Sequence, residues 1–241
     1  MEFTSITFRS TLFPQSPIQM DEKWIARLNS IMSKFELVPS VGTTYNISME
    51  QPGGNPKFDQ LHFINFKKFD DSFKITFLPD RFDIEKKVSS ISMLDPIGDF
   101  LKNVEEIWSS IKCLELTYCR VALALIAEMK ISNEERDDII TKITQRGDGR
   151  TATELSQRIV YKTDYNTEYP ADIIKTNEVQ EFGCDNISDN DSLLKIGLDY
   201  NSSMDNNTEI ISRQYIHFLT EAARRITTIM DAGNIRNILG I

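Results

Sequence analysis

The chain has 241 residues, of which 40% are hydrophobic and 26% charged, and its formal net charge is −9. This size and composition exclude a wholly disordered protein and a small scaffold held by disulfides. No apolar run approaches the roughly 18 residues of a membrane span, and the N-terminus has no secretory pattern, so we expect a cytoplasmic protein without a membrane partner. The three irregularly spaced cysteines, Cys113, Cys119 and Cys184, are predicted to be small buried hydrophobic residues in a reducing compartment.

The negative charge is concentrated between residues 163 and 209, where eleven acidic residues face only Lys175 and Lys195. This excess opposes general binding to a phosphate backbone. It favours either a solvated surface or a docking surface for a protein partner. The apolar C-terminal segment "NIRNILGI", residues 234–241, is a second candidate for partner contact.

The first half of the chain begins with a strand at residues 5–13, where apolar and polar residues alternate. Asp21 predicts a helix N-cap, and the helix that follows closes before Pro39. Strands are expected at residues 45–50, 58–69, 73–78 and 81–89, with a turn at Asp70-Asp71. Asp95-Pro96 predicts the start of a helix that reaches Ile111 and has an apolar stripe at helical spacing from Ile97 onward. Twelve of the fourteen phenylalanines precede residue 101, and their spacing predicts core packing.

The second half begins with a strand at residues 118–129 that is apolar nearly throughout, so we expect both of its faces to be covered. Ser132 and Glu135 form a capping-box pattern, which predicts a helix over residues 132–144. Strands are expected at residues 157–165, 172–182 and 192–201, with a polar loop at 183–192 between the last two. A final helix should begin near Thr208 and end near Gly233, with an apolar stripe at helical spacing from Ile211 to Ile229.

The two halves have the same order of elements: a strand, a helix, several strands and a helix. We therefore predict an α+β fold, a curved antiparallel sheet with helices on one face, built from two strand-helix-strands-helix pseudo-repeats. The N-terminal pseudo-repeat covers residues 1–115 and the C-terminal one residues 116–241. Because no linker composition separates them, they should form one fused body.

No catalytic motif is present, and we predict neither a catalytic residue, nor a metal ligand, nor a cofactor. His62 and His217 belong to no metal pattern. The loop "QRGDGR" is the best candidate for anion contact, because Arg146 and Arg150 flank two glycines whose backbone could approach a phosphate; Arg158 follows on the next strand. The alternative is a flexible connection between helix and strand.

The stretch "SLLKIGLDYN", residues 192–201, ends in three polar side chains. By strand alternation Asp199 should lie at the exposed end of the strand, and Tyr200 should point to the core. We predict that Asp199 caps loop or helix backbone. The competing interpretation is a divalent-cation site with nearby acids such as Asp191, Asp205 and Glu209.

Two segments carry a resemblance. "RVALALIAEM" (120–129) is an arginine-led apolar strand, and "LLKIGLDYN" (193–201) precedes the long helical segment "ISRQYIHFLTEAARRIT" (211–227). This order resembles an uncharacterised, sporadically distributed bacterial protein family with no established activity. The mid-chain strand departs from the family pattern in lacking a polar Arg-Tyr-Asn-type ending. The resemblance implies an accessory bacterial protein, for instance from a mobile or defence-associated operon.

The sequence thus favours a non-enzymatic protein-binding or regulatory accessory protein. The alternative is a nucleic-acid or nucleotide-binding module with a groove lined by arginines such as Arg9, Arg120, Arg146, Arg150 and Arg158. A hydrolase whose carboxylates meet between the two halves is the third hypothesis. The oligomeric state stays open.

Overall fold

The structure is a computed structural model that describes residues 3–48, 57–91, 94–144, 155–165, 174–202, 210 and 212–231. In this part of the chain the strands are β1 (Phe3–Pro14), β2 (Val38–Ser48), β3 (Lys57–Lys67), β4 (Phe73–Phe77), β5 (Phe82–Ile91), β6 (Tyr118–Ser132), β7 (Leu155–Tyr165), β8 (Ile174–Asn186) and β9 (Asp191–Ser202). The α-helices are α1 (Glu22–Met32), α2 (Leu94–Ile111), α3 (Asn133–Thr144) and α4 (Ser212–Met230), and the short 3-10 helices η1 (Ser33–Phe35) and η2 (Lys112–Leu114) follow α1 and α2.

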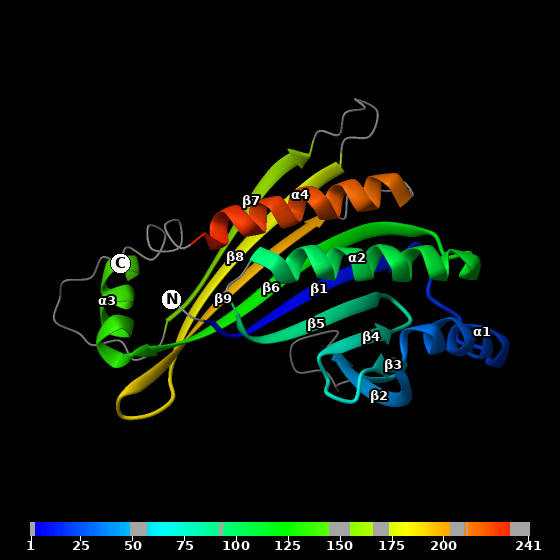
Figure 1. Ribbon diagram of the computed structural model, residues 1–241, viewed down its shortest axis with the longest axis horizontal. Coiled ribbons are helices and arrows are strands. Elements are labelled where there is room, and N and C mark those ends of the chain that lie inside the picture. The colour runs from blue at the N-terminus through cyan, green and yellow to red at the C-terminus, as the bar shows by residue number, and fades with distance from the viewer. Residues whose placement is uncertain are drawn as a thin grey trace.

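The nine described strands form one open, twisted sheet in the order β2-β3-β4-β5-β1-β6-β9-β8-β7 (Figure 1). Every pair of neighbours is antiparallel. At the centre, β1 of the first half pairs with β6 of the second half, with Phe8 opposite Leu125. The predicted α+β class with an antiparallel sheet is therefore confirmed.

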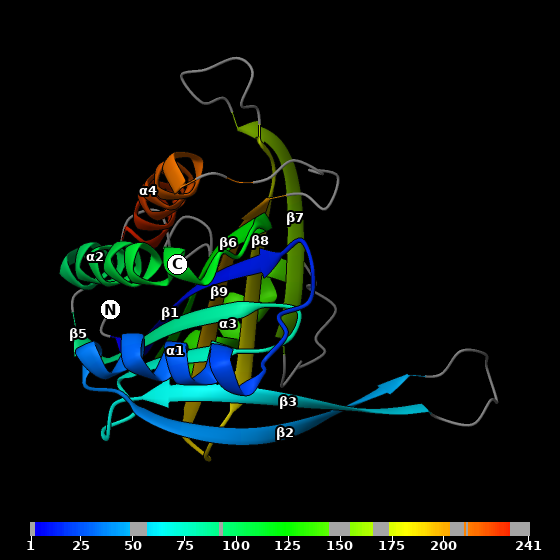
Figure 2. The same cartoon turned by 90° about the vertical axis from the view of Figure 1, so that its right-hand side faces the viewer.

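One face of the sheet carries the apolar side chains. In β1, Ile6, Phe8 and Leu12 are buried on this face, whereas Arg9 lies on the other face and pairs with Glu85. This period of two is the reason why the sequence forms a strand here, since it places one apolar row against the helices. Helices α2 and α4 lie side by side over the apolar face (Figure 2).

The predicted apolar stripes of α2 and α4 are confirmed. They recur at helical spacing, so each helix buries one side against the sheet. The buried residues of these stripes are Ile97, Phe100, Val104, Ile107, Trp108 and Ile111 in α2, and Tyr215, Phe218, Ala222 and Ile226 in α4. Helix α4 begins at Ser212, and the expected boundaries at Thr208 and Gly233 lie outside the described residues.

An aromatic cluster joins the two helices to the centre of the sheet. The ring of Trp108 lies 4.6 Å from that of Tyr215 and 5.0 Å from that of Tyr118, measured between centroids. The hydroxyls of Tyr215 and Ser10 form a buried hydrogen bond of 2.9 Å. This cluster contains residues from both halves of the chain and connects α2, α4, β1 and β6.

The expectation that both faces of the mid-chain strand are covered is wrong. Ile126 is 42% exposed on the face of β6 that no described helix covers. Its neighbours on that face are Ala122 and Ala124. Because alanine is apolar, the strand sequence is apolar on both faces, although only side chains of the helix-covered face belong to the main hydrophobic core.

Two boundaries also differ from the sequence prediction. The polar loop expected at 183–192 is shorter, because β8 runs to Asn186 and β9 begins at Asp191, with Asn186 opposite Ser192. Strand β2 begins at Val38, well before the predicted residue 45, so Pro39 lies within a strand. Because β2 is at the edge of the sheet, it tolerates the missing N–H of proline.

The cysteine prediction holds only for Cys184, which is buried; Cys113 is exposed and Cys119 is half-buried. Core packing of the phenylalanines fails at Phe69, which is 93% exposed. Phe69 lies two residues beyond the end of β3, where the alternation that buries Ile64 and Phe66 has ended. The chain turns there, so an apolar residue in the same run of sequence points to solvent.

Candidate functional site

Of the three arginines predicted to contact anions, only Arg158 can be placed. Arg146 and Arg150 lie outside the described residues. Arg158 is exposed on β7, and its Nε donates to Oε1 of Glu181 at 2.9 Å, directly across the β7–β8 pair. The charge of Arg158 is thereby balanced by an acid of the neighbouring strand.

The pairing of β6 with β9 brings Arg120 and Asp199 into one polar cluster on the helix-free face. Asn201 Nδ2 donates to Asp199 Oδ2 at 3.0 Å, and Arg120 Nη2 donates to Asn201 Oδ1 at 3.2 Å. Among the described residues the Asp199 carboxylate accepts from a side-chain amide, and residues 203–209, whose backbone it was predicted to cap, lie outside the described part of the chain. The register places Ala124 opposite Asp199, and only the three-dimensional pairing reveals this cluster.

Burial raises the pKa of Asp199, although Asn201 and Arg120 oppose the shift. Its Oδ1 is buried without a hydrogen-bond partner among the described residues. A raised carboxyl pKa means that the native state holds this proton more tightly than the unfolded state does. The free energy of unfolding therefore falls as pH rises through the ordinary aspartate pKa and then the raised one.

We expect Asp199→Asn to be more stable than the wild type at pH 7, because the substitution removes a charge that burial disfavours. The difference should shrink as pH falls through the raised pKa of Asp199 and should be smallest below about 4, where the aspartate is protonated in both states. Melting temperatures of both proteins between acidic and neutral pH test this. A variant less stable than the wild type at pH 7 would show that the ionised carboxylate is favoured in the fold.

Asp191 is too far from Asp199 to share a cation site with it. Asp191 lies at the other end of β9, about 26 Å along the strand at its usual rise per residue, and pairs with Lys130 at 2.8 Å. Asp205 and Glu209 are outside the described residues. Within the described ranges, no group of three or more His, Cys, Asp or Glu side chains is placed to hold a metal.

Tyr200 points to the helix-covered face, as predicted, and is only 3% exposed. Its pKa is raised by burial and then by the charge of Glu178, so the phenol stays protonated, and its buried hydroxyl has no hydrogen-bond partner among the described residues. Arg225 of α4 lies 3.8 Å from Glu178 and 3.1 Å from Glu221. Hydrogen bonds from Arg224 and Arg225 lower the pKa of Glu221 to about 2. This network connects α4 to β8.

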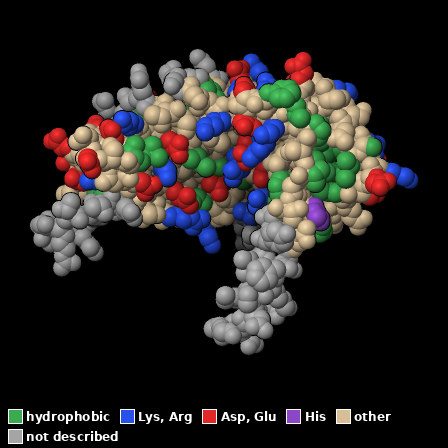
Figure 3. Space-filling view, turned by 90° about the horizontal axis from the view of Figure 1, so that it is seen from below, with side chains coloured by type: hydrophobic (Ala, Val, Ile, Leu, Met, Phe, Trp, Pro, Cys, Tyr) green, Lys and Arg blue, Asp and Glu red, His purple; other side chains and the backbone are tan. Residues whose placement is uncertain are grey.

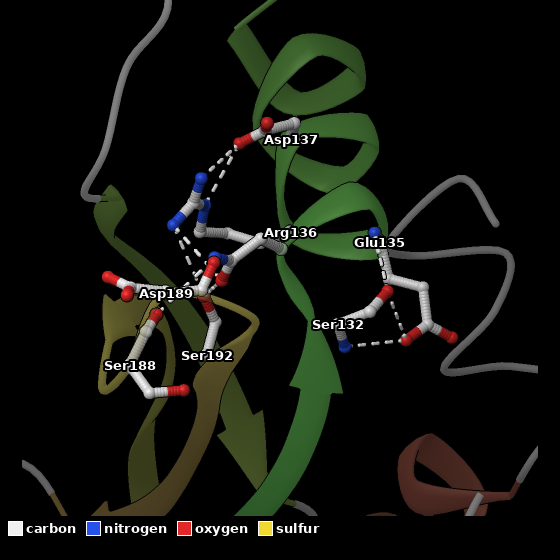
Figure 4. Close-up of polar contacts among 8 residues, drawn as sticks. Ser132, Glu135, Arg136, Asp137, Ser188, Asp189 and Ser192 are labelled. Atoms are coloured by element: carbon white, nitrogen blue, oxygen red, sulfur yellow. Dashed lines mark hydrogen bonds and ion pairs between the residues drawn. The ribbon is translucent and has the colours of Figure 1, made fainter.

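Arg136 is the centre of a second buried polar cluster, at the base of α3 (Figure 4). Its Nη1 donates to Ser192 Oγ at 3.2 Å, and both Nε and Nη2 donate to Asp137 Oδ1. Asn133 Nδ2 donates to the carbonyl of Asp189 at 2.8 Å. These bonds fasten the first turn of α3 to the β8–β9 connection, which identifies the cluster as a structural clasp.

The predicted capping box beside this clasp is confirmed. Ser132 Oγ accepts from the backbone N–H of Glu135 at 3.1 Å, and the Glu135 carboxylate accepts from the backbone N–H of Ser132 at 2.9 Å. Each residue satisfies a backbone donor that the first turn of a helix leaves free.

The turn between β3 and β4 presents Phe69 to solvent. Asp70 Oδ1 accepts from both the backbone N–H and the hydroxyl of Ser72, at 3.0 and 2.7 Å, and these bonds lower the pKa of Asp70. The backbone N–H of Asp71 donates to the carbonyl of Lys68 at 3.1 Å. Asp71 has a positive φ of 54°, which aspartate adopts more readily than most residues.

Further bonds attach this turn to the sheet. The backbone N–H of Lys87 on β5 donates to the carbonyl of Ser72 at 2.8 Å, and Lys67 Nζ lies 2.8 Å from Asp71 Oδ1. The turn is therefore held in one conformation, and Phe69 projects from a fixed support. An aromatic side chain in this position is suited to insertion into another surface.

Searches for related proteins give no match to any family model and none among curated proteins. In the described part of the chain, no helix combines the length and the apolarity needed to cross a bilayer.

Proposed function

We propose that this chain is a non-enzymatic binding protein that docks a partner protein through Phe69. The observation that carries the proposal is an aromatic side chain 93% exposed on a turn held by several backbone and side-chain bonds. Exposing a phenylalanine leaves about 1.5–3 kcal/mol of burial free energy unused. A partner that covers Phe69 gains this free energy without having to order the turn first.

The acidic segment 163–209 gives little support to the docking proposal, because several of its negative charges are balanced by nearby basic side chains. Four of its acids have basic neighbours: Glu178 with Arg225, Glu181 with Arg158, Asp185 with Lys195 and Asp191 with Lys130. On the side of the molecule in Figure 3, acidic and basic side chains are interspersed. The C-terminal segment 234–241 lies outside the described residues, so Phe69 is the feature on which docking can be argued.

The nucleic-acid alternative requires several unpaired arginines in one groove. Arg158 and Arg9 each have a glutamate partner, at 2.9 and 3.0 Å. These pairings weaken the electrostatic attraction that phosphate binding requires, and we therefore favour a protein partner. The role as an accessory protein of a bacterial operon rests on the family resemblance alone.

Phe69→Ser should weaken binding to the partner by about 10- to 100-fold, the loss expected when a buried phenylalanine is removed from an interface. The partner is sought among the products of the neighbouring genes, by co-purification with the tagged wild-type chain. Its dissociation constant is then measured for both proteins by calorimetry.

Val41→Ser is the matched control, because Val41 is also an exposed apolar residue, at 75%, but lies on the edge strand β2. It should bind as the wild type does. Equal binding by Phe69→Ser and the wild type would contradict the proposal, provided that both proteins have the same melting temperature.

We also infer that residues 1–115 and 116–241 are pseudo-repeats fused into one body. In support, the first strands of the two halves, β1 and β6, pair at the sheet centre, and the last strands, β5 and β9, flank them. The last helices, α2 and α4, contact each other. In the described part of the chain, the first half has one strand more than the second.

Residues 1–115 expressed alone should not fold, because β1 loses its partner β6 and Trp108 loses its contacts with Tyr118 and Tyr215. The amide proton spectrum of this fragment should show the narrow dispersion of an unfolded chain. A well-dispersed spectrum would instead establish two independent domains.

A further inference from the structure

A cavity of about 180 Å³ lies between the β4–β5 region of the sheet and helix α2. Phe35, Phe73 and Ile107 form its apolar wall, and Lys68 and Lys86 also line it. A cavity of about 150 Å³ accommodates a benzene ring, so this one has room for a single six-membered ring. Phe69 is not part of its lining, although the same turn contributes Lys68.

Lys86 has an unusual position for a cation. It belongs to the helix-covered face of the sheet, where its cross-strand neighbours are Phe8 on β1 and Phe73 on β4. Its side chain is half-buried. Lys86 forms no ion pair with a carboxylate in the described residues, whereas the charge of Lys68 acts on the Asp70 carboxylate and helps to lower its pKa. By contrast, Lys67 and Lys74, which lie close by in sequence, are paired with Asp71 and Glu85.

Lys86 lies beside phenylalanine rings and has no carboxylate partner among the described residues, and an anion in the cavity would supply the missing counter-charge. The side-chain amide of Asn103 adds a hydrogen-bond donor to the lining. Glu106, the acid in the lining, repels a second negative charge. The cavity therefore combines an apolar wall with a net charge that suits a monoanion.

We propose that this cavity binds a small organic monocarboxylate. The ring or hydrocarbon part of the ligand packs against Phe35, Phe73 and Ile107, and its carboxylate lies between Lys68 and Lys86. This site is separate from the docking of a protein partner at Phe69.

Benzoate is the probe, and its neutral isostere benzamide is the matched ligand control. A ligand of this size should bind with a dissociation constant of about 0.1–1 mM. Titration followed in the amide spectrum should shift the signals of Ser72 and Asn103. Benzamide should bind at least about tenfold more weakly than benzoate, because it cannot form a charge-assisted hydrogen bond.

Lys86→Met should weaken benzoate binding by about tenfold or more, and should leave benzamide binding unchanged. Lys87→Met, on the helix-free face of the same strand, is the control and should bind benzoate normally. Glu106→Gln should tighten benzoate binding, because it removes the opposing charge. Phe69→Ser should bind benzoate as the wild type does, so the two proposals fail separately.

Absence of saturable shifts up to about 10 mM benzoate, a concentration well above the expected dissociation constant, would overturn the proposal. Equal affinity for benzoate and benzamide would also overturn it, as would normal benzoate binding by Lys86→Met.

Discussion

Trp108→Ala should lower the free energy of unfolding by about 3–5 kcal/mol, the usual cost of truncating a large core aromatic. Trp108 is 6% exposed, and its ring contacts Tyr118 and Tyr215 from the second half of the chain. The truncation thus removes the ring contacts through which α2 packs against both α4 and β6. Urea denaturation followed by far-ultraviolet circular dichroism measures the loss.

Trp108→Phe is the matched variant, because it keeps an aromatic ring in the cluster and should retain most of the stability. Trp24→Ala gives a second comparison, at a half-buried tryptophan of α1 that contacts Phe77 edge-on. If Trp108→Ala unfolds at the urea concentration of the wild type, then the aromatic cluster does not hold the two halves together.

Arg136→Met should lower the free energy of unfolding by about 1–3 kcal/mol, because buried partners of a charged group lose their hydrogen bonds. Arg136 is 5% exposed, and its guanidinium connects the first turn of α3 to Ser192 on β9. Methionine keeps much of the side-chain volume, so the loss reports on the polar contacts. Faster hydrogen exchange in α3 should accompany it.

The exposed ion pair of Arg158 and Glu181 provides the control. Both side chains are more than half exposed, and Arg158→Met should cost no more than about 1 kcal/mol. An equal effect of the two substitutions would show that Arg136 behaves as an ordinary surface arginine, and that the clasp at α3 does not stabilise the fold.

The elements that could be predicted from the sequence are those with local signals. Helices α2 and α4 follow from apolar residues at helical spacing, and the start of α3 follows from Ser132 and Glu135, whose side chains satisfy the helix backbone directly. The start of α1 follows in the same way from Asp21, whose Oδ1 accepts from the backbone N–H of Trp24 at 2.8 Å. These interactions span only three or four residues, so the sequence contains both partners.

The misplaced features depend on contacts between distant residues. Ile126 is exposed because no described helix covers that face of β6, and an apolar run cannot reveal this. Arg120 and Asn201 are 81 residues apart, and Arg136 and Ser192 are 56 apart, so neither polar cluster has a local signature. Composition also misled at Phe69, where a phenylalanine-rich stretch suggested core packing throughout. Asp70 and Asp71, which end this stretch, did predict a turn, but the turn already includes Phe69 and removes it from the strand alternation.

The central claim is that a partner protein covers Phe69, and site-specific photocrosslinking tests it most directly. A photoreactive phenylalanine analogue placed at residue 69 in the source cell should yield one dominant crosslinked protein. The same analogue at Val41, which is exposed on β2, should not yield it. If the two positions give the same crosslinked products, or if position 69 gives none while the protein is folded and abundant, the docking role of Phe69 is wrong.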